Sequence, residues 1–223
     1  VNIVTVEDPV EYDLDNINQA QINQKSGVTF ASALRSILRQ DPDIIMVGEV
    51  RDEETVELGI RAALTGHLVF STIHTNDAAS GFTRLLNWDV EPFLIASTVK
   101  GILAQRLVRR ICNECKESYS PNENELEMIG LGKDDPIEAY KGKGCLACRN
   151  TGFKGRIGIY ELLLMDGEIS ELVLNQEPGY KIREQARANG MTTLLEDGLI
   201  KIKRGDTTIS EVYETLGTSK IVL

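Results

Sequence analysis

The segment DPDIIMVGEVRD, residues 41–52, constrains the fold of this chain more than any other segment. It opens with Pro42, which cannot continue a helix, and then runs through four bulky apolar residues, 44–47, to Gly48. A short apolar run between turn signals is typical of a strand that is buried on both faces of a parallel sheet. Glu49 follows at the carboxyl end of this strand, where open α/β sheets bind their ligands. A carboxylate there can hold magnesium or polarise an attacking water, although a core strand that ends in a surface glutamate would look the same.

Two further strands are predicted, and each is followed by polar residues. Residues 1–6 are rich in β-branched side chains and lead to Glu7 and Asp8. Residues 68–71 lead to the polar segment 72–77. With a helix predicted between successive strands, this order is typical of an α/β fold with a mostly parallel sheet and helices on both faces. The three strands are then expected to deliver their polar residues to the same edge, unless those residues only form solvated loops.

A helix is predicted over residues 29–40, with Thr29 as its N-cap and a regular apolar stripe. Arg35 and Arg39 lie one turn apart on its other side. They can reach phosphate oxygens, on this or a neighbouring subunit, or they are ordinary solvated arginines. Asp52 is expected to cap the next helix, which Gly66 ends.

Residues 76–110 are predicted to be mostly helical. Four basic residues gather in the last part of this segment: Lys100, Arg106, Arg109 and Arg110. In an acidic protein this cluster either faces a nucleotide or an acidic subunit edge, or is the solvated end of a helix.

Four cysteines fall in two C-x2-C pairs, which are Cys112 with Cys115 and Cys145 with Cys148. Two such pairs offer four thiolates with the spacing for tetrahedral zinc, and redox dithiols are the alternative. Because all four ligands are thiols, the predicted zinc is structural. Within this lobe a short helix is expected over 122–129 and a loop over 130–144.

The remainder of the chain is predicted to form a strand within residues 149–165 and then a helical subdomain. Its helices are expected near 168–175, 178–189, 192–204 and 208–216. We therefore divide the chain into an α/β core (1–110), a tetracysteine lobe (111–155) and a strand with the helical subdomain (156–223).

Composition excludes some classes of function. The net charge is −10 and aromatic residues are only 5% of the chain, which argues against a nucleic-acid binder, including a zinc-ribbon one. No run of about 18 apolar residues is present, so no transmembrane segment is expected. The opening VNIVTVED does not resemble a signal peptide.

Several segments, taken together and in order, resemble the secretion ATPases that drive type II secretion and type IV pilus assembly. They are TVEDPVEY (5–12), FASALRSILRQDPDIIMVGEVRD (30–52), TGHLVFSTIHTNDA (65–78), AQRLVRRIC (104–112) and the paired cysteines. The resemblance implies a RecA-like ATPase core. The first segment then corresponds to an aspartate box, the second ends in Walker B, and the third corresponds to a histidine box.

The resemblance also implies roles for individual residues. Glu49 would be the catalytic Walker B glutamate, and Glu7 would assist it near the attacking water. The predicted nucleotide and magnesium site contains Asp8, Arg35, Arg39, Arg51, Thr72 and His74. Of these, His74 would sense the γ-phosphate, and which arginines reach phosphate stays open.

Members of this family work as hexameric rings on the cytoplasmic face of the inner membrane, where a membrane-embedded platform protein uses their motion. The resemblance therefore implies ATP, Mg²⁺, a homohexamer and such a partner. The tetracysteine lobe favours an assembly or secretion ATPase over a retraction ATPase. The choice between pilus assembly and type II secretion stays open, as does a related motor for DNA uptake or conjugation.

One departure from the family is that no G-x-x-x-x-G-K-[ST] motif occurs in the 223 residues. That motif supplies the backbone amides and the lysine that hold the β- and γ-phosphates. We expect the chain to be the C-terminal half of an ATPase, inactive by itself and monomeric or weakly dimeric. The alternative is a non-catalytic, zinc-stapled module that docks on the same machinery.

Overall fold

The computed structural model describes residues 1–135 and 137–217, and these form two compact units. The first unit combines residues 1–102 with residues 163–186, and the described residues among 103–162 and 187–217 form the second.

The three predicted segments do not coincide with these units, and as domain boundaries they stay predictions. Residue 136, in the predicted 111–155 segment, and residues 218–223, in the predicted 156–223 segment, lie outside the described residues.

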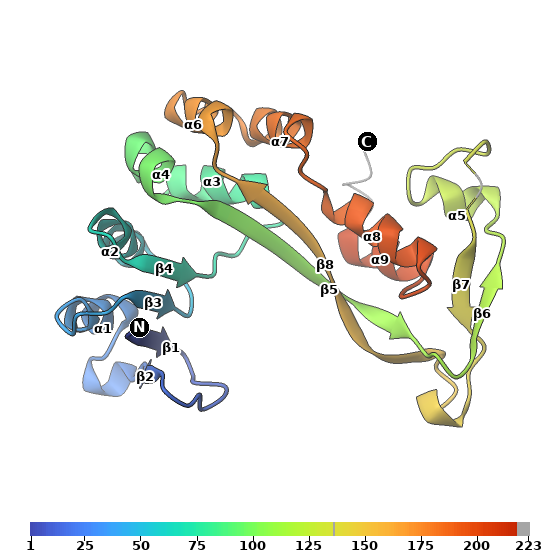
Figure 1. The fold of residues 1–223 in the computed structure, drawn as a ribbon, viewed down its shortest axis with the longest axis horizontal. Helices are drawn as coiled ribbons and strands as arrows, with labels where there is room; N and C mark the ends of the chain where they lie inside the picture. Colours follow the sequence, from blue (N-terminus) through green and yellow to red (C-terminus); the bar gives the residue numbers. More distant parts are fainter. Residues whose placement is uncertain (136, 218–223) are drawn as a thin grey trace. The chain divides into compact units, whose positions relative to one another are not determined.

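The first unit is built on a four-stranded parallel sheet (Figure 1). The strands, in their order across the sheet, are β2 (Asn18–Gln21), β1 (Ile3–Glu7), β3 (Ile44–Val47) and β4 (Leu68–Ser71). The three predicted strands are thus confirmed as β1, β3 and β4. The register pairs Val6 with Val47 and Val47 with Ser71, so these three strands end level at one edge of the sheet.

The two helices that connect these strands begin where the sequence predicts. In α1 (Phe30–Ile37), the hydroxyl of Thr29 accepts a hydrogen bond from Ser32 N. In α2 (Glu53–Leu64), the Asp52 carboxylate accepts one from the backbone N–H of Thr55 at 2.8 Å. Each cap satisfies one of the N–H groups that the first turn leaves unpaired.

Both helices pack on the same face of the sheet. Val4, Val6, Ile45 and Val47 form one buried cluster with Ala33, Leu34 and Ile37 of α1 and Ala62 of α2. Leu34 is fully buried there. Replacing a fully buried leucine by alanine costs about 2–5 kcal/mol, so this cluster is what holds the strand ends in place.

The strand β2 has no counterpart in the sequence prediction. Its residues, NQAQ, are polar and show no apolar alternation. The strand forms because it pairs along the outer edge of β1, with Gln19 beside Thr5. A 3-10 turn, η1 (Gln24–Ser26), follows it and leads to α1.

The prediction that residues 76–110 are mostly helical is wrong in its last part. Helices α3 (Ala78–Leu86) and α4 (Pro92–Thr98) are present, but β5 (Gly101–Ile111) is a strand. It pairs with β8 (Phe153–Leu164), which confirms the strand expected within 149–165. Pairing with β8 decides the conformation of β5, because its buried residues would fit a helical face equally well.

The segment between the cysteine pairs is also more regular than predicted. The expected short helix is α5 (Glu123–Glu127). The predicted loop over 130–144 is wrong at its end, where β7 (Ala139–Gly142) pairs antiparallel with β6 (Lys116–Tyr119). A 3-10 turn, η2 (Leu146–Cys148), carries the second cysteine pair.

All four helices expected toward the end of the chain are present. They are α6 (Gly167–Leu174), α7 (Gly179–Ala188), α8 (Leu194–Lys203) and α9 (Ile209–Leu216). Within the second unit, α8 and α9 pack against one another. Among the described residues, no helix is long and apolar enough to cross a membrane.

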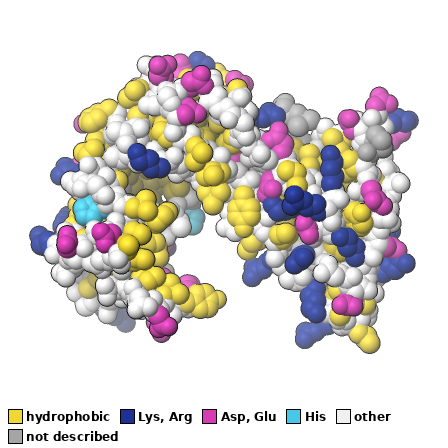
Figure 2. All heavy atoms as spheres, viewed as in Figure 1, with side chains coloured by type: hydrophobic (Ala, Val, Ile, Leu, Met, Phe, Trp, Pro, Cys, Tyr) yellow, Lys and Arg dark blue, Asp and Glu magenta, His cyan; other side chains and the backbone are white. Residues whose placement is uncertain are grey.

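Basic side chains are conspicuous on the second unit in Figure 2, which shows one face of the molecule. Arg109, one of the four predicted cluster residues, does not lie at a helix end. Its guanidinium and its backbone N–H donate to Glu211 of α9, a residue that is almost fully buried. The Arg109 side chain therefore links β5 to α9 within this unit.

Candidate functional site

The level ends of β1, β3 and β4 bring three polar segments to one edge of the sheet. The backbone N–H of Gly48 donates to Val6 O at 2.8 Å, and the hydroxyl of Thr72 donates to Gly48 O at 2.7 Å. A Cβ atom on Gly48 would lie 3.1 Å from Val6 O, which is closer than nine in ten real Cβ contacts. A glycine at this position therefore lets the Glu7 and Glu49 segments lie against each other.

Glu49 is held between two cationic or titratable side chains. Its Oε1 lies 2.5 Å from Arg51 Nη2, and its Oε2 lies 3.3 Å from His74 Nε2. Because a carboxylate only accepts, His74 carries its proton on Nε2 in this contact. The side chain of Glu49 is 14% exposed, so it lies in a recess rather than on an open surface.

Arg51 lowers the pKa of the Glu49 carboxyl below its usual value, against the opposing effect of burial, and His74 lowers it further. In return, Glu49 raises the pKa of Arg51. Glu49 is therefore ionised at neutral pH, which is the form that can accept a proton from water or bind a cation.

The Glu7 carboxylate is fixed from two sides. Its Oε1 accepts hydrogen bonds from the Thr5 hydroxyl at 2.6 Å and from Gln19 Nε2 at 2.9 Å. Asp8 is exposed and lies near enough to Arg51 to raise its pKa. A pocket of about 290 Å³ lies beside these groups, and its lining includes Asp8, Thr29, Phe30, Arg51, Asp52 and Glu54.

The two arginines predicted on α1 take different positions. Arg35 pairs with Glu54, a residue that lines the pocket just described. Arg39 is exposed and has no ion pair with a described residue. The structure thus brings Glu49, Arg51 and His74 into direct contact, whereas Arg35 and Arg39 do not contact them.

Three contacts near the site were not predicted from the sequence. Thr5 and Gln19 hold Glu7, and Arg183 of α7 pairs with Asp77, the cap of α3, at 2.5 Å. The Gln19 and Arg183 contacts join distant parts of the chain, and only the presence of β2 beside β1 would have indicated the one from Gln19. Thr5 lies two residues before Glu7 on β1, so strand alternation places these two side chains on one face.

The second histidine of the chain does not belong to this edge. His67 Nδ1 lies 2.9 Å from Ala62 O, at the end of α2 and before the start of β4. Its contact fixes the turn between helix and strand. Of the two histidines, only His74 is placed at the carboxyl ends of the strands.

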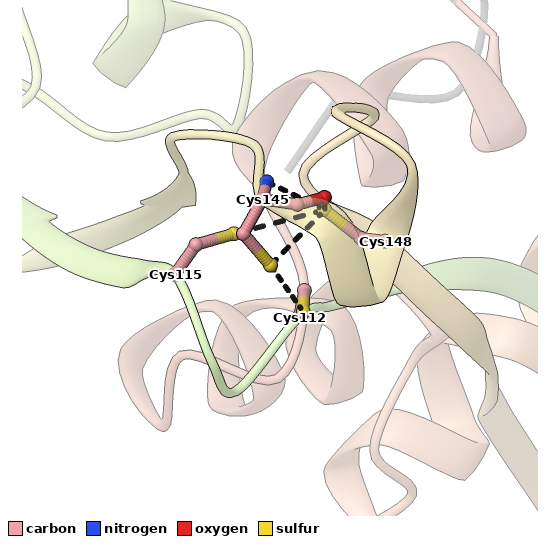
Figure 3. Close-up of side chains that lie close together, drawn as sticks. All are labelled: Cys112, Cys115, Cys145 and Cys148. Carbon is pink, nitrogen blue, oxygen red and sulfur yellow. Dashed lines mark hydrogen bonds between the residues drawn. The ribbon is translucent and has the colours of Figure 1, made fainter.

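The four cysteines of the second unit converge on one point (Figure 3). Their sulfur atoms all lie within 4.8 Å of one another. The Sγ distances are 3.8 Å from Cys112 to Cys145, 3.9 Å from Cys115 to Cys148 and 3.7 Å from Cys145 to Cys148. Around a tetrahedral zinc with bonds of about 2.3 Å, sulfurs lie about 3.8 Å apart, so this donor set fits such an ion.

The surroundings of Cys148 favour a thiolate, whereas those of Cys115 favour the thiol as long as no metal is bound. The backbone N–H groups of Cys145 and Gly152 donate to Cys148 Sγ at 3.2 and 3.3 Å. At Cys148, burial would raise the pKa, but these N–H groups lower it to about 6. Burial raises the pKa of Cys115 to about 12. Donation from backbone N–H to sulfur is the arrangement that supports thiolate ligands of a metal.

These features agree with comparisons to known proteins. A family model described as Type II/IV secretion system protein matches residues 1–214. The chain belongs to this family. Members of the type II/IV secretion family with high similarity include the type IV pilus assembly ATPase PilB of Thermus thermophilus, 52% identical over 213 residues. The type II secretion system ATPase E of Vibrio cholerae is 46% identical over 211 residues.

The fold class is confirmed by similarity to a solved structure. The crystal structure of the pilus retraction motor PilT with bound ADP superposes with a TM-score of 0.71 and 28% identity. That match covers 100% of this chain and 54% of the PilT chain. The PilB and ATPase E matches each cover 95% of this chain, but only 24% and 42% of those relatives. The chain thus spans about half of the solved relative and less than half of these two curated ones.

Proposed function

We propose that this chain is the C-terminal part of an ATP-hydrolysing motor for type IV pilus assembly or type II secretion. The observation that carries the proposal is the ionised Glu49, recessed between Arg51 and His74 at the end of β3. An acid in this position can polarise a water for attack on a phosphoryl group. The similarity to PilB and ATPase E supports the same reaction.

In this mechanism, the Glu49 carboxylate accepts a hydrogen bond from the attacking water, and Glu7 helps to position that water. Asp8 contributes a further carboxylate for the Mg²⁺ shell, and Thr72 fixes the edge through Gly48. When bound, Mg²⁺ would supply positive charge to the phosphates. Its oxygen donors would be carboxylates of these residues, the ligand type that Mg²⁺ prefers.

The basic residues have separate proposed roles. His74, in contact with Glu49, would register the γ-phosphate through that contact. Arg51 would neutralise charge near Glu49. Arg35 and Arg39 are proposed to reach phosphate only across a subunit boundary, since neither contacts Glu49 in the described chain.

The absence of a G-x-x-x-x-G-K-[ST] motif from the sequence limits what residues 1–223 do by themselves. We propose that they bind ATP weakly or not at all and do not turn it over, because the groups that hold the β- and γ-phosphates are lacking. Steady ATP hydrolysis by the purified chain would refute this.

The assembly proposed for the full-length protein is a homohexamer, peripheral to the cytoplasmic face of the inner membrane. Its partner would be a membrane-embedded platform protein of the pilus or secretion machinery. Similarity to PilB and ATPase E supports the link to pilus assembly or type II secretion, and the resemblance described above suggests the ring and its partner. Analytical ultracentrifugation of the full-length protein with ATP would test the hexamer directly.

The tetracysteine cluster is proposed to bind one structural Zn²⁺. Its four thiols fill a tetrahedral shell, which leaves no position for a catalytic water. A second candidate function, a zinc-stapled module that only docks on the secretion machinery, is favoured by the lack of a phosphate-binding loop.

The decisive test is Glu49→Gln in the full-length protein. We expect kcat to fall by roughly 10²–10⁴-fold, because an amide cannot accept the proton, while nucleotide binding is spared. The matched control is Glu57→Gln, which removes an exposed carboxylate that pairs with Arg61 on the outside of α2. Near wild-type turnover by Glu49→Gln would show that the assignment of Glu49 is wrong. A wild-type protein that hydrolyses no ATP would favour the docking module.

A further inference from the structure

The carboxylate of Glu7 is held asymmetrically. Its Oε1 accepts two hydrogen bonds, from the Thr5 hydroxyl at 2.6 Å and from Gln19 Nε2 at 2.9 Å. Its Oε2 accepts none from a described residue. One oxygen is thus saturated, and the other keeps its lone pairs for a ligand or a water.

The sheet register explains why these three side chains meet. Thr5 of β1 lies directly beside Gln19 of β2. Glu7 lies two residues beyond Thr5, and alternate residues of a strand point to the same face. All three therefore share one face of the sheet. This face is the one opposite the core cluster that contains Val4 and Val6.

Gln19 is itself locked. Its Nε2 donates a second hydrogen bond to Tyr12 O at 3.1 Å, and its Oε1 accepts from the backbone N–H of Leu14 at 2.7 Å. The amide can satisfy these partners in only one orientation, with nitrogen toward the two oxygens. Thr5 is 3% exposed, so its hydroxyl is also confined. Neither donor to Glu7 is free to swing away.

We propose that Thr5 and Gln19 are positioning residues for ATP hydrolysis, which act by fixing the direction of the Glu7 carboxylate. The assignment rests on the proposed function, in which Glu7 works beside the attacking water. A carboxylate on a freely rotating side chain spends little time in the productive geometry, and a misplacement of about 1 Å can cost roughly 10²-fold in rate. Two rigid donors on one oxygen remove that freedom.

A purely structural role is the competing explanation, because Gln19 also ties down the loop at residues 12–14. The two explanations differ in what happens once Glu7 can no longer act. If Gln19 and Thr5 work through the Glu7 carboxylate, their loss has no further effect on turnover when Glu7 is already replaced. If they only support the fold, the effects add.

The test uses the full-length enzyme and steady-state ATP hydrolysis. Thr5→Val keeps the shape and removes the hydroxyl, and Gln19→Leu removes the amide from a half-buried position. We expect each to lower kcat by about tenfold or more, with KM for ATP within about twofold. Thr5→Ser restores the donor and is expected to keep kcat near wild type. The control is Asn18→Ala, on the same strand as Gln19, which loses only an exposed hydrogen bond to Asn2.

The second arm repeats Thr5→Val and Gln19→Leu in a Glu7→Gln background, where neither is expected to lower kcat further. An additive loss there overturns the proposal, as does wild-type kcat for both single variants in an active enzyme. If Thr5→Val does not fold, Gln19→Leu decides alone. A wild-type enzyme that hydrolyses no ATP overturns the proposed function itself, and this assignment with it.

Discussion

Removal of the Arg109 guanidinium tests how the second unit is held together. Glu211 of α9 has a side chain that is only 8% exposed. It accepts hydrogen bonds from Arg109 N at 2.9 Å and Arg109 Nε at 2.8 Å, and it also contacts Arg109 Nη2. In Arg109→Met the apolar stem remains, but the buried carboxylate keeps only the backbone donor.

The magnitude follows from the unequal burial of the two partners. Removing one member of a fully buried ion pair costs about 3–5 kcal/mol, because a buried charge is left uncompensated. The Arg109 side chain is 56% exposed, so water can replace part of the hydrogen bonding that the guanidinium supplies. We therefore expect Arg109→Met to lower the free energy of unfolding by about 2 kcal/mol. Glu211→Gln leaves a solvated guanidinium and a neutral amide. We therefore expect this variant to lower the free energy of unfolding by about 1 kcal/mol or less.

The assay is urea unfolding followed by hydrogen exchange in peptides from β5 and α9. Trp88, the single tryptophan of the chain, lies in the first unit and reports on that unit separately. Arg110→Met is the matched control, since Arg110 is exposed and pairs with no described acid, and its effect should stay within about 0.5 kcal/mol. Equal destabilisation by Glu211→Gln and Arg109→Met would contradict this role of the Arg109 guanidinium, as would an Arg109→Met variant as mild as Arg110→Met.

Three further predictions concern the second unit. Burial would raise the pKa of Glu211, but hydrogen bonds from Arg109 hold it below the usual 4.5. Its stabilisation is therefore present above that pH and lost as pH falls through the lowered folded-state value, so acid unfolding followed by circular dichroism should be less pH-dependent in Glu211→Gln. Metal analysis should give about one zinc per chain and less in Cys112→Ser. Chelation should speed hydrogen exchange in residues 110–155 while sheet amides stay protected, and sheet unfolding would contradict a local role. Gly198→Ala places a Cβ 2.7 Å from Val212 Cγ1. The overpacking should cost about 1–3 kcal/mol of stability, which outweighs the gain of about 1 kcal/mol in helix propensity. Adding Val212→Ala to this variant should recover part of the lost stability, measured by urea unfolding.

Strand β3 and helices α1 and α2 were predictable because each had two independent local signals. Strand β3 combined an apolar run with Pro42 before it and Gly48 after it. Helices α1 and α2 combined an apolar stripe with a capping residue, Thr29 or Asp52. When turn residues and apolar periodicity indicate the same element, long-range contacts rarely change its conformation.

The errors occur where the local pattern fits two structures. In β5, Ala104, Val108 and Ile111 are buried, and their spacing of four and three residues also matches one face of a helix. Only the pairing with β8, which begins more than 40 residues later in the sequence, selects the strand. The same holds for β7, whose partner β6 lies across the intervening α5. Pairing partners of this kind are invisible to periodicity.

The same distinction applies to the candidate site, where local patterns predict some contacts and only long-range pairing explains others. Glu49 and His74 could be predicted as neighbours because each follows a predicted strand of the sheet, and the carboxyl ends of parallel strands share an edge. Gln19 could not, since it lies in the middle of a polar strand whose existence depends on the free edge of β1. The contact from Gln19 to Glu7 needs the exact register of that pairing, because a shift by one residue would turn the amide to the other face. A catalytic acid can thus be proposed from sequence, but the residues that fix its direction require the structure.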